Sequence, residues 1–384
     1  MDADTGLPVV GMIGAGQLAR MTHQAVIPLG MSLRVLAASA DDGAARVAAD
    51  VEVGDHTDLG ALRSFAADCD VVTFDHEHVP QEHIAALIAD GATVHPGPDA
   101  LRYAQDKRAM REEIARLGLP SPRWTPISTE ADLAEFGVPC VVKTTRGGYD
   151  GKGVFVIEDV SDAAELLASD VDLIAEELVR LRRELAVSIA RTPSGSTVVY
   201  PVVETVQSGG ICTEVIAPAP NASPALIERA RHIATTIADA VGVTGVMTVE
   251  LFETADGLLV NELAMRPHNS GHWTIEGAIT SQFEQHVRAI LDYPLGSVET
   301  TAPVTVMANV LGGDSPIPPD ERLRRLMSHD PTAKVHLYGK AERPGRKIGH
   351  VTVRGDTIEN AFARARTAAA ILRDGIDTTT KEAT

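Results

Sequence analysis

Two acidic residues in the second half of the chain have the spacing of a metal site. Glu250 lies within the apolar segment TVELFE, Glu262 ends the segment LLVNE, and an Asp-Gly turn at 256–257 separates them. Two adjacent antiparallel strands would bring both carboxylates to one space. Paired carboxylates without His or Cys partners favour Mg²⁺ or Mn²⁺, which also bind triphosphate oxygens; two independent surface acids would face solvent instead. We therefore predict that Glu250 and Glu262 bind a divalent metal.

A glycine-rich segment, KTTRGGYDGKGV, carries two lysines. Lys143 ends an apolar segment, and four glycines surround Lys152. Backbone amides and ammonium groups both neutralise phosphoryl oxygens, so the segment is interpreted as a polyphosphate clamp rather than a plain surface hairpin. Its spacing differs from the G-x-x-x-x-G-K-[ST] loop, and a P-loop fold is not implied.

Three further glutamates flank an arginine-rich loop in AEELVRLRRELAV. Glu176 and Glu177 close one apolar segment, and Glu184 opens the next. Strand-end carboxylates can accept hydrogen bonds from an adenine amino group and from ribose hydroxyls. Acids beside arginines are more often solvated ion pairs of small energetic value. Because the chain also carries the glycine-rich segment, we favour the nucleotide-binding interpretation for Glu176 and Glu184.

Two clusters of polar side chains could bind anions. In MRPHNSGHW, Arg266 can hold a carboxylate or phosphate with two parallel hydrogen bonds. His268 could move a proton near neutral pH, although a single His is more often only hydrogen-bonded. The second cluster, in the tail, is either a phosphate site or a solvated turn; it consists of Lys340, Arg343, Arg346 and Lys347.

The turn GAGQLA, with glycines at Gly14 and Gly16, lies between a strand pattern and a helix pattern. A dinucleotide site would require an acid at the end of the second strand. That strand ends in 37–40 without one. A mononucleotide phosphate at the helix N-terminus is the better functional interpretation, and a tightly packed turn without a ligand is the alternative.

The segments that carry these residues alternate between strand and helix patterns. In the first hundred residues the expected strands are 9–13, 33–37 and 71–74, and the expected helices are 17–29, 44–47 and 58–67. This alternation predicts a parallel sheet covered by helices. One long helix is expected at 100–117, a strand at 197–204, and helices at 224–241 and 281–291.

Composition limits the possible functions. At 384 residues, two or three domains are expected. The net charge of −19 argues against nucleic-acid binding and requires a local cation cluster for any anionic substrate. Cys69, Cys140 and Cys212 lack metal-type spacing, which favours reduced thiols. Neither a signal peptide nor the roughly 18–20 apolar residues of a membrane helix is found, so a cytoplasmic protein without membrane contact is expected.

Together these motifs resemble the N5-carboxyaminoimidazole ribonucleotide synthase family of the ATP-grasp superfamily. The resemblance spans about 9–353 and is most specific in NELAMRPHNSGHWTIEGAITSQFEQHVRA; GQLARM, GGYDGKG, YPVVETV and YGK…RPGRKIGH agree with it. It implies a mixed α/β and α+β fold, with a Rossmann-like domain at 1–100, an ATP-grasp domain at 101–301 whose lid covers about 120–180, and a small C-terminal domain at 302–384. It also implies a homodimer that uses ATP, Mg²⁺, bicarbonate and 5-aminoimidazole ribonucleotide.

The resemblance further implies roles for individual residues. ATP would be bound by Lys107, Lys143, Gly148, Tyr149, Asp150, Gly151, Lys152, Gly153, Val154, Glu176, Glu177, Leu178, Val179, Glu184, Asn261 and Glu262. The ribonucleotide and carboxyphosphate would be bound by Gly16, Gln17, Leu18, Glu77, Tyr149, Asp150, Arg266, His268, Asn269, Ser270, Lys340, Arg346 and Lys347. The catalytic residues would be Lys143, Asp150, Arg266 and His268.

Several positions depart from the family pattern. Lys107 stands where Arg is usual, Gln207 where a nucleotide-contacting His is usual, and Met265 where Pro is usual. Other departures are Ala15 and Ala19 in place of glycines and Asp75–His76 in place of Glu–Phe. We expect these changes to affect affinity more than the reaction.

Three other functions remain open from the sequence. A formate-dependent glycinamide ribonucleotide transformylase would share the superfamily. A dinucleotide-dependent oxidoreductase would rest on the first glycine turn alone. A binding protein without catalysis is disfavoured by the ordered set Lys143, Glu250, Glu262 and Arg266.

Overall fold

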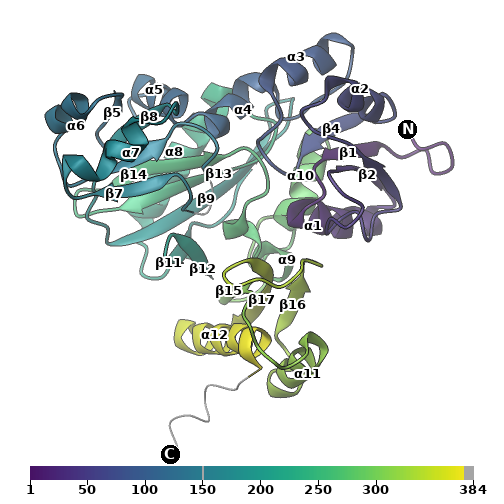
Figure 1. Cartoon of the computed structure of the whole chain (residues 1–384). Coiled ribbons are helices and arrows are strands. Elements are labelled where there is room, and N and C mark those ends of the chain that lie inside the picture. Colours follow the sequence, from purple (N-terminus) through teal and green to yellow (C-terminus); the bar gives the residue numbers. More distant parts are fainter. Residues whose placement is uncertain (149–150, 376–384) are drawn as a thin grey trace, which may run out of the picture.

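The computed structural model describes residues 1–148 and 151–375, whose strands form three sheets (Figure 1). Tyr149 and Asp150 lie outside the described residues, so the roles predicted for them stay predictions. Among the residues described, no helix combines the length and the apolar character needed to cross a bilayer.

The first sheet is parallel and four-stranded, in the order β3-β2-β1-β4. Its elements are β1 (Val9–Ile13), α1 (Gln17–Val26), η1 (Ile27–Leu29), β2 (Ser32–Ala37), β3 (Asp50–Val53), α2 (Leu59–Ala67), β4 (Val71–Phe74) and α3 (Gln81–Ala89). The predicted parallel sheet is confirmed. The predicted helix at 44–47 is wrong: this segment forms turns, and the Ala44 N–H donates to the Ala15 carbonyl instead of to a helical partner.

The single helix predicted at 100–117 is also wrong, because two helices occupy this segment. They are α4 (Pro98–Gln105) and α5 (Lys107–Arg116). Asp106 between them is extended, with φ −132° and ψ 106°, and its carboxylate accepts a hydrogen bond from the Ala109 N–H at 3.0 Å. An Asp in this geometry caps a new helix. The break therefore makes Lys107 the first residue of α5.

A second sheet of four antiparallel strands forms a separate layer, in the order β5-β8-β6-β7. Its elements are β5 (Trp124–Ile127), α6 (Glu130–Phe136), β6 (Cys140–Thr144), β7 (Val154–Ile157), η2 (Val160–Ala163), α7 (Ala164–Leu167) and β8 (Leu173–Glu177). One face packs on α6, with Leu133 and Phe136 in the core. This sheet, at the left of Figure 1, lies within the segment predicted to form a lid, and we call it the lid sheet, or lid; its closure stays a prediction.

The third sheet has nine strands, in the order β14-β13-β9-β11-β12-β15-β17-β16 with β10 on β9. They are β9 (Arg183–Arg191), β10 (Thr197–Val199), β11 (Val203–Ser208), β12 (Ile211–Ala217), β13 (Gly245–Glu253), β14 (Leu258–Ala264), β15 (Val304–Leu311), β16 (Lys334–Leu337) and β17 (Lys347–Gly355). The strand predicted at 197–204 is split in two, since Pro201 has no N–H to donate to a ladder. The C-terminal strands join the same sheet, because β15 pairs with β12.

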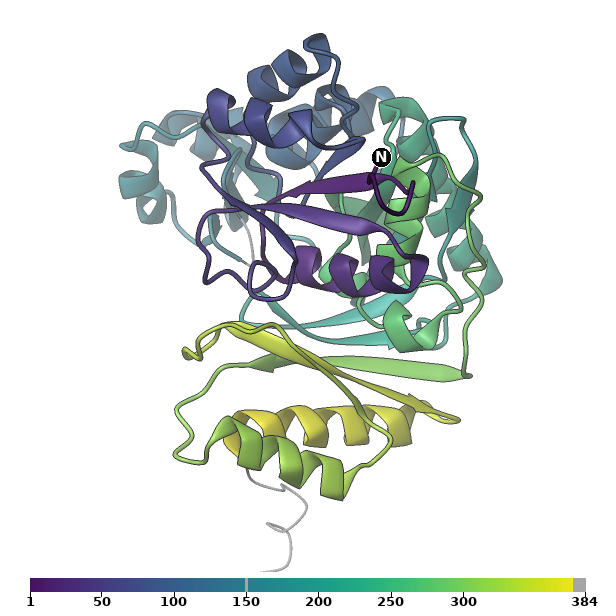
Figure 2. The ribbon, with the colours of Figure 1, turned by 90° about the vertical axis from the view of Figure 1, so that its right-hand side faces the viewer.

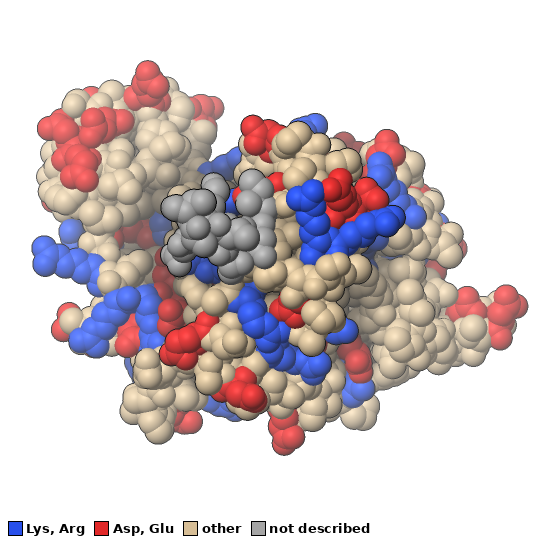
Figure 3. All heavy atoms as spheres, turned by 90° about the horizontal axis from the view of Figure 1, so that it is seen from below, with Lys and Arg blue, Asp and Glu red and all other residues tan. Residues whose placement is uncertain are grey.

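Helices cover this large sheet at both ends. They are α8 (Pro224–Val241), η3 (Asn269–Gly271), α9 (Thr274–Gly277), α10 (Gln282–Ile290), α11 (Pro319–His329) and α12 (Ile358–Asp374). The last two lie below the C-terminal strands in Figure 2. Along α8, residues Ala230, Ile233, Ala234 and Ile237 are buried, which is the spacing of one helical face. Seen from below, basic and acidic side chains are interspersed over the surface (Figure 3).

Candidate active site

The carboxylates of Glu250 and Glu262 come together on the β13–β14 hairpin. The two residues are direct cross-strand partners. Burial, then repulsion by Glu262 and by Glu184, raises the pKa of Glu250 to about 8. The prediction that the hairpin places both carboxylates in one space is confirmed. Two carboxylates held this close together repel each other, and a bound cation would offset that repulsion.

A bulge in β14 brings a third polar side chain to the same place. Glu250 pairs with Glu262 but Leu251 pairs with Val260, which leaves Asn261 as the extra residue. Asn261 Nδ2 donates to Glu250 Oε2 at 3.4 Å, and its Oδ1 accepts from Lys143 Nζ at 3.3 Å. Consecutive strand residues normally point to opposite faces, and a bulge re-aims one of them. Asn261 and Glu262 can therefore serve one site.

Lys143 on β6 of the lid is held by a buried ion triad. Lys143 Nζ lies 2.7 Å from Glu176 Oε2, and Arg111 Nε lies 2.7 Å from Glu176 Oε1. Arg111 Nη1 also donates to the Val260 carbonyl at 2.8 Å. Burial opposes ionisation of Glu176, but the charges of Lys143 and Arg111 outweigh it and lower its pKa. The triad thus joins the lid to α5 and to the large sheet.

Arg111 is a site residue that the sequence analysis missed. Its side chain is completely buried on α5, on the same face as Met110 and Ile114. The sequence could have indicated a buried role for Arg111, because a basic residue lies there between apolar neighbours on one helical face. Lys107, one turn earlier, lies with its Nζ 3.5 Å from Glu262 Oε1. Lys107 and Lys143, two of the three lysines predicted to bind ATP, therefore approach the Asn261–Glu262 pair.

Among the other described residues predicted to bind ATP, Glu184 has a pKa that depends on Lys143. Burial raises the pKa of Glu184, against the effect of Lys143 and a hydrogen bond with Gln207. Glu177 instead accepts a hydrogen bond from the Arg123 N–H at 2.9 Å, and the chain continues from β8 through Leu178 and Val179. The glycine-rich turn leads into β7 through Gly148, Gly151, Lys152, Gly153 and Val154.

Glycine is required in that turn on steric grounds. Gly151 and Gly153 have φ of +77° and +74°, a region that disfavours other residues. A Cβ on Gly153 would lie 2.5 Å from Thr144 Oγ1, and one on Gly148 would lie 2.7 Å from the Lys152 carbonyl oxygen. Close backbone packing thus accounts for these glycines.

Arg266 and Glu77 meet although they come from different sheets. Arg266 Nε lies 2.9 Å from Glu77 Oε2, and the Met265 N–H donates to Glu77 Oε1 at 3.3 Å. Glu77 follows β4, at the carboxyl edge of the parallel sheet. The pair fixes the segment after β14 against the N-terminal sheet, at the place where α/β sheets bind ligands.

His268 faces the carboxylate pair as a neutral donor. Its Nε2 lies 3.5 Å from Glu250 Oε1, and its Nδ1 accepts from the Ser270 N–H at 3.3 Å. Because that N–H can only donate, the ring proton belongs on Nε2. Burial, together with the charges of Arg266 and Lys347, lowers the pKa of His268 to about 3. The surroundings therefore favour the neutral form of His268, and its predicted role in proton transfer stays a prediction.

Asn269 and Ser270 have mainly buried partners. Asn269 forms a doubly hydrogen-bonded amide pair with Asn309, at 2.7 and 3.0 Å. Ser270 Oγ lies 2.9 Å from His268 Nδ1. Both side chains shape the loop around His268.

The first glycine turn has a partner inside the protein. The Gly16 N–H donates to the carboxyl group of Asp75, whose pKa is raised by burial, at the N-terminus of α1. Gln17 Oε1 accepts from Lys340 Nζ at 2.6 Å, and Leu18 packs in the core. A phosphate at this turn stays a prediction.

The tail residues are divided between site and surface. Lys347 begins β17 and lowers the pKa of Glu250, which places its charge near the carboxylate pair. Arg346 is exposed, and its Nη1 donates to the Ala341 carbonyl at 3.1 Å. The structure therefore brings Lys347, but not Arg346, toward the predicted metal site.

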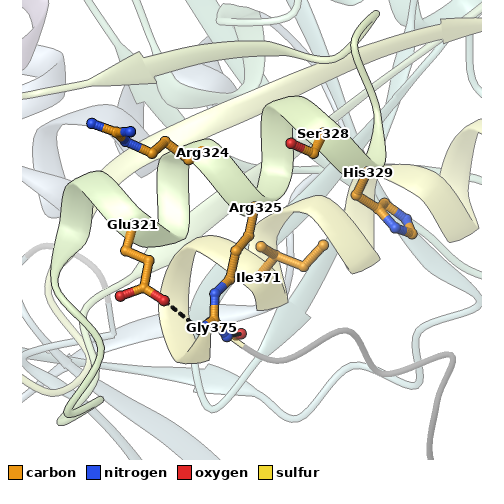
Figure 4. Close-up of a pocket in the computed structure, with 7 residues that line it drawn as sticks. All are labelled: Glu321, Arg324, Arg325, Ser328, His329, Ile371 and Gly375. Carbon is orange, nitrogen blue, oxygen red and sulfur yellow. Dashed lines mark hydrogen bonds and ion pairs between the residues drawn. The ribbon is translucent and has the colours of Figure 1, made fainter.

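A separate hollow lies between α11 and α12 (Figure 4). Within it, Arg325 pairs with Glu321 at 2.5 Å and donates to the Gly375 carbonyl at 2.7 Å. No residue predicted for catalysis or binding is among those that line it. The β13–β14 hairpin, rather than this hollow, is the candidate active site.

Family models match three consecutive parts of the chain. They describe a ribonucleotide synthetase preATP-grasp domain at residues 7–105, an ATP-grasp domain at 112–283 and a phosphoribosylaminoimidazole carboxylase C-terminal domain at 305–364. The lid, the large sheet and the lysines opposite paired carboxylates thus define an ATP-grasp ligase.

Curated relatives narrow this class. N5-carboxyaminoimidazole ribonucleotide synthase from Mycobacterium tuberculosis is 55% identical over 379 residues, covering 96% of this chain and 88% of that protein. The Corynebacterium ammoniagenes synthase is 49% identical over 96% of this chain and 92% of its own length. The chain belongs to the N5-carboxyaminoimidazole ribonucleotide synthase family.

Solved structures agree with this assignment. The synthetase from Thermus thermophilus is 38% identical with a TM-score of 0.85, covering 95% of this chain and 98% of that one. The Aspergillus clavatus synthase in complex with ADP and 5-aminoimidazole ribonucleotide is 33% identical with a TM-score of 0.87, over 95% and 98% of the two chains. The expected fold class is confirmed.

Proposed function

We propose that the protein uses ATP and bicarbonate to carboxylate 5-aminoimidazole ribonucleotide in purine biosynthesis. The products are N5-carboxyaminoimidazole ribonucleotide, ADP and phosphate, and carboxyphosphate is the intermediate. The observation that carries the proposal is the Glu250–Glu262 pair, linked through Asn261 to Lys143 of the lid. Such a site would hold a divalent cation and a triphosphate opposite a lysine, as ATP activation requires.

Mg²⁺ fits the two carboxylates, and Mn²⁺ shares their ligand preference. Within residues 1–148 and 151–375, no group of three or more His, Cys, Asp or Glu side chains gathers as metal ligands. Mg²⁺ commonly takes one or two carboxylates and completes its shell with phosphate oxygens and water. Glu250 and Glu262 would hold the ion, which when bound neutralises charge on the transferred phosphoryl group.

The chain's own residues would orient the reactants. Lys107 and Lys143 would bind phosphoryl oxygens, and Glu184 would accept hydrogen bonds from the adenosine. Both carboxylate oxygens of Glu176 already contact Arg111 and Lys143, so Glu176 would hold Lys143 in place instead of contacting adenosine as predicted. Bicarbonate is a poor electrophile, so its oxygen first attacks the γ-phosphorus of ATP, the bond to the β,γ-bridging oxygen breaks, and ADP leaves. The resulting carboxyphosphate has phosphate as a leaving group. Closure of the lid would exclude water, which hydrolyses this intermediate.

The second half-reaction would use the segment after β14. Arg266 would bind the carboxyphosphate or the ribonucleotide phosphate, and His268 would donate a hydrogen bond from Nε2. The exocyclic amine then attacks the carboxyl carbon, and phosphate leaves. Asp150, outside the described residues, is proposed to take the amine proton.

We also propose a cytoplasmic homodimer that binds neither nucleic acid nor membrane. The family resemblance supports the dimer, and the net charge of −19 supports the lack of nucleic-acid binding. Sedimentation of the purified chain tests the oligomeric state.

The assay that tests the proposal is ADP release that depends on both bicarbonate and 5-aminoimidazole ribonucleotide. Glu262→Ala should abolish it. Glu253→Ala is the control, because Glu253 lies on the same hairpin but pairs with Arg183 at 2.6 Å. Ribonucleotide-dependent release retained by Glu262→Ala contradicts the metal assignment. Activity with formate and glycinamide ribonucleotide instead would favour the transformylase, and tight NAD(P) binding would favour the oxidoreductase.

A further inference from the structure

Gln282, the first residue of α10, forms hydrogen bonds with both backbone groups of His268. Its side chain is completely buried. Oε1 accepts from the His268 N–H at 2.9 Å, while Nε2 donates to the His268 carbonyl at 2.8 Å and lies 3.0 Å from His272 Nδ1. Only one orientation of the amide satisfies both backbone groups, because the N–H needs an acceptor and the carbonyl needs a donor.

Gln282 is itself fixed by the loop that it holds. Its N–H donates to Thr274 Oγ1 at 2.9 Å, and that hydroxyl lies 2.6 Å from the Gly271 carbonyl. A Cβ on Gly271 would lie 2.2 Å from Gln282 Oε1. The absence of a side chain at Gly271 therefore leaves the space that the amide occupies.

We infer that Gln282 is a positioning residue for the proposed reaction. Its amide fixes the His268 peptide, and this sets the direction of the imidazole, whose Nε2 lies 3.5 Å from Glu250, and of Arg266 two residues earlier. Displacement of a catalytic group by about 1 Å can cost on the order of 100-fold in rate. The inference rests on the proposed function, because it assigns Gln282 to the ribonucleotide half of that reaction.

The same helix supplies a matched control. Gln285 is also completely buried, and its amide holds one backbone residue in the same way. Its Nε2 donates to the Gly296 carbonyl at 2.8 Å, and its Oε1 accepts from the Gly296 N–H at 2.8 Å. Gly296 belongs to none of the predicted site segments. Replacing either glutamine therefore removes two hydrogen bonds between a buried side-chain amide and the backbone of one residue.

The test compares Gln282→Met with Gln285→Met in the full chain, by melting temperature and by steady-state kinetics. Both variants should lower the melting temperature similarly. Gln282→Met should lower kcat/KM for 5-aminoimidazole ribonucleotide about 100-fold and leave the KM for ATP within about twofold. Gln285→Met should keep both constants within about threefold of the unmodified protein. Gly271→Ala, which pushes the Gln282 amide away without removing it, should reproduce the loss selective for the ribonucleotide.

The inference is overturned if Gln282→Met and Gln285→Met lose kcat/KM for the ribonucleotide to the same extent. It is also overturned if Gln282→Met raises the KM for ATP as much as the KM for the ribonucleotide. If Gln282→Met fails to fold, Gln282→Glu carries the test, since it keeps the size of the side chain and the oxygen that accepts from His268; a smaller loss of the same selectivity is then expected. An unmodified protein without ribonucleotide-dependent ADP release overturns the proposed function and this inference with it. An active protein with unselective variants overturns the inference alone.

Discussion

Replacing Arg111 by Met should strongly destabilise the protein and weaken ATP binding. The substitution keeps the length of the apolar stem but removes the guanidinium, which lies 2.7 Å from Glu176 and 2.8 Å from the Val260 carbonyl. Arg111 is fully buried and Glu176 is only 3% exposed. The carboxylate would therefore stay in a site from which water is largely excluded.

The magnitude follows from these contacts. Removing one partner of a buried ion pair usually costs about 3–5 kcal/mol. Lys143, still 2.7 Å from Glu176, reduces that loss, whereas the unpaired Val260 carbonyl adds about 1–3 kcal/mol. A net loss of about 3–5 kcal/mol is expected. With its carboxylate partner less well fixed, Lys143 should also bind ATP more weakly.

Arg108→Met is the control, because it lies on the same helix and pairs at 3.0 Å with Glu112 on the surface. Exposed pairs of this kind are worth about 0.3–0.5 kcal/mol. Urea denaturation of the ligand-free protein, followed by tryptophan fluorescence, should therefore separate the two variants clearly. Equal shifts of the denaturation midpoint would refute the view that the buried triad stabilises the junction between lid and large sheet.

Three further outcomes are expected. The pKa of Glu250 is about 8 in the fold against 4.5 for the free side chain, so stability present at low pH is lost as pH rises from about 4.5 to 8. Glu250→Gln in chelator should therefore raise the melting temperature at about pH 8 and change it little at about pH 5; the opposite order would contradict the burial of this charge. Arg266→Lys should raise the KM for the ribonucleotide about tenfold or more, since Lys cannot hold Glu77 and a planar anion together; an unchanged KM in steady-state assays would exclude the contact. Gly11→Ala should lower the free energy of unfolding by about 1–3 kcal/mol in urea denaturation, because its Cβ would lie 2.4 Å from Cys69 Sγ. Adding Cys69→Ala should recover part of that loss. If the double variant recovers nothing, the strain does not come from the contact with Cys69.

Local patterns in the sequence were sufficient to predict the carboxylate pair. The Asp-Gly turn and the apolar segments around it specify a hairpin, and the hairpin register places Glu250 opposite Glu262. The bulge at Asn261 was not predicted, because no residue type marks it. Its effect is nonetheless central, since it turns Asn261 toward both Glu250 and Lys143.

Contacts between distant segments explain the other differences. A charged residue on a helix is usually solvated, so Arg111 gave little reason to expect a buried partner 65 residues away. The pattern of the glycine turn before α1 likewise gave no sign that Asp75, 59 residues later, accepts a hydrogen bond from the Gly16 N–H. Pairings of this kind depend on the tertiary fold and cannot be read from spacing.

The antiparallel pairing of β12 with β15 has a consequence for truncation. Residues 214–217 exchange backbone hydrogen bonds with 305–308, so the chain before 302 lacks a complete sheet of its own. A shortened protein would present β12 as an open edge of unpaired N–H and carbonyl groups, ready to recruit a strand from a second molecule. Shortened forms should therefore aggregate rather than survive as independent modules. The same continuity of the sheet sets the position of Lys347 relative to Glu250.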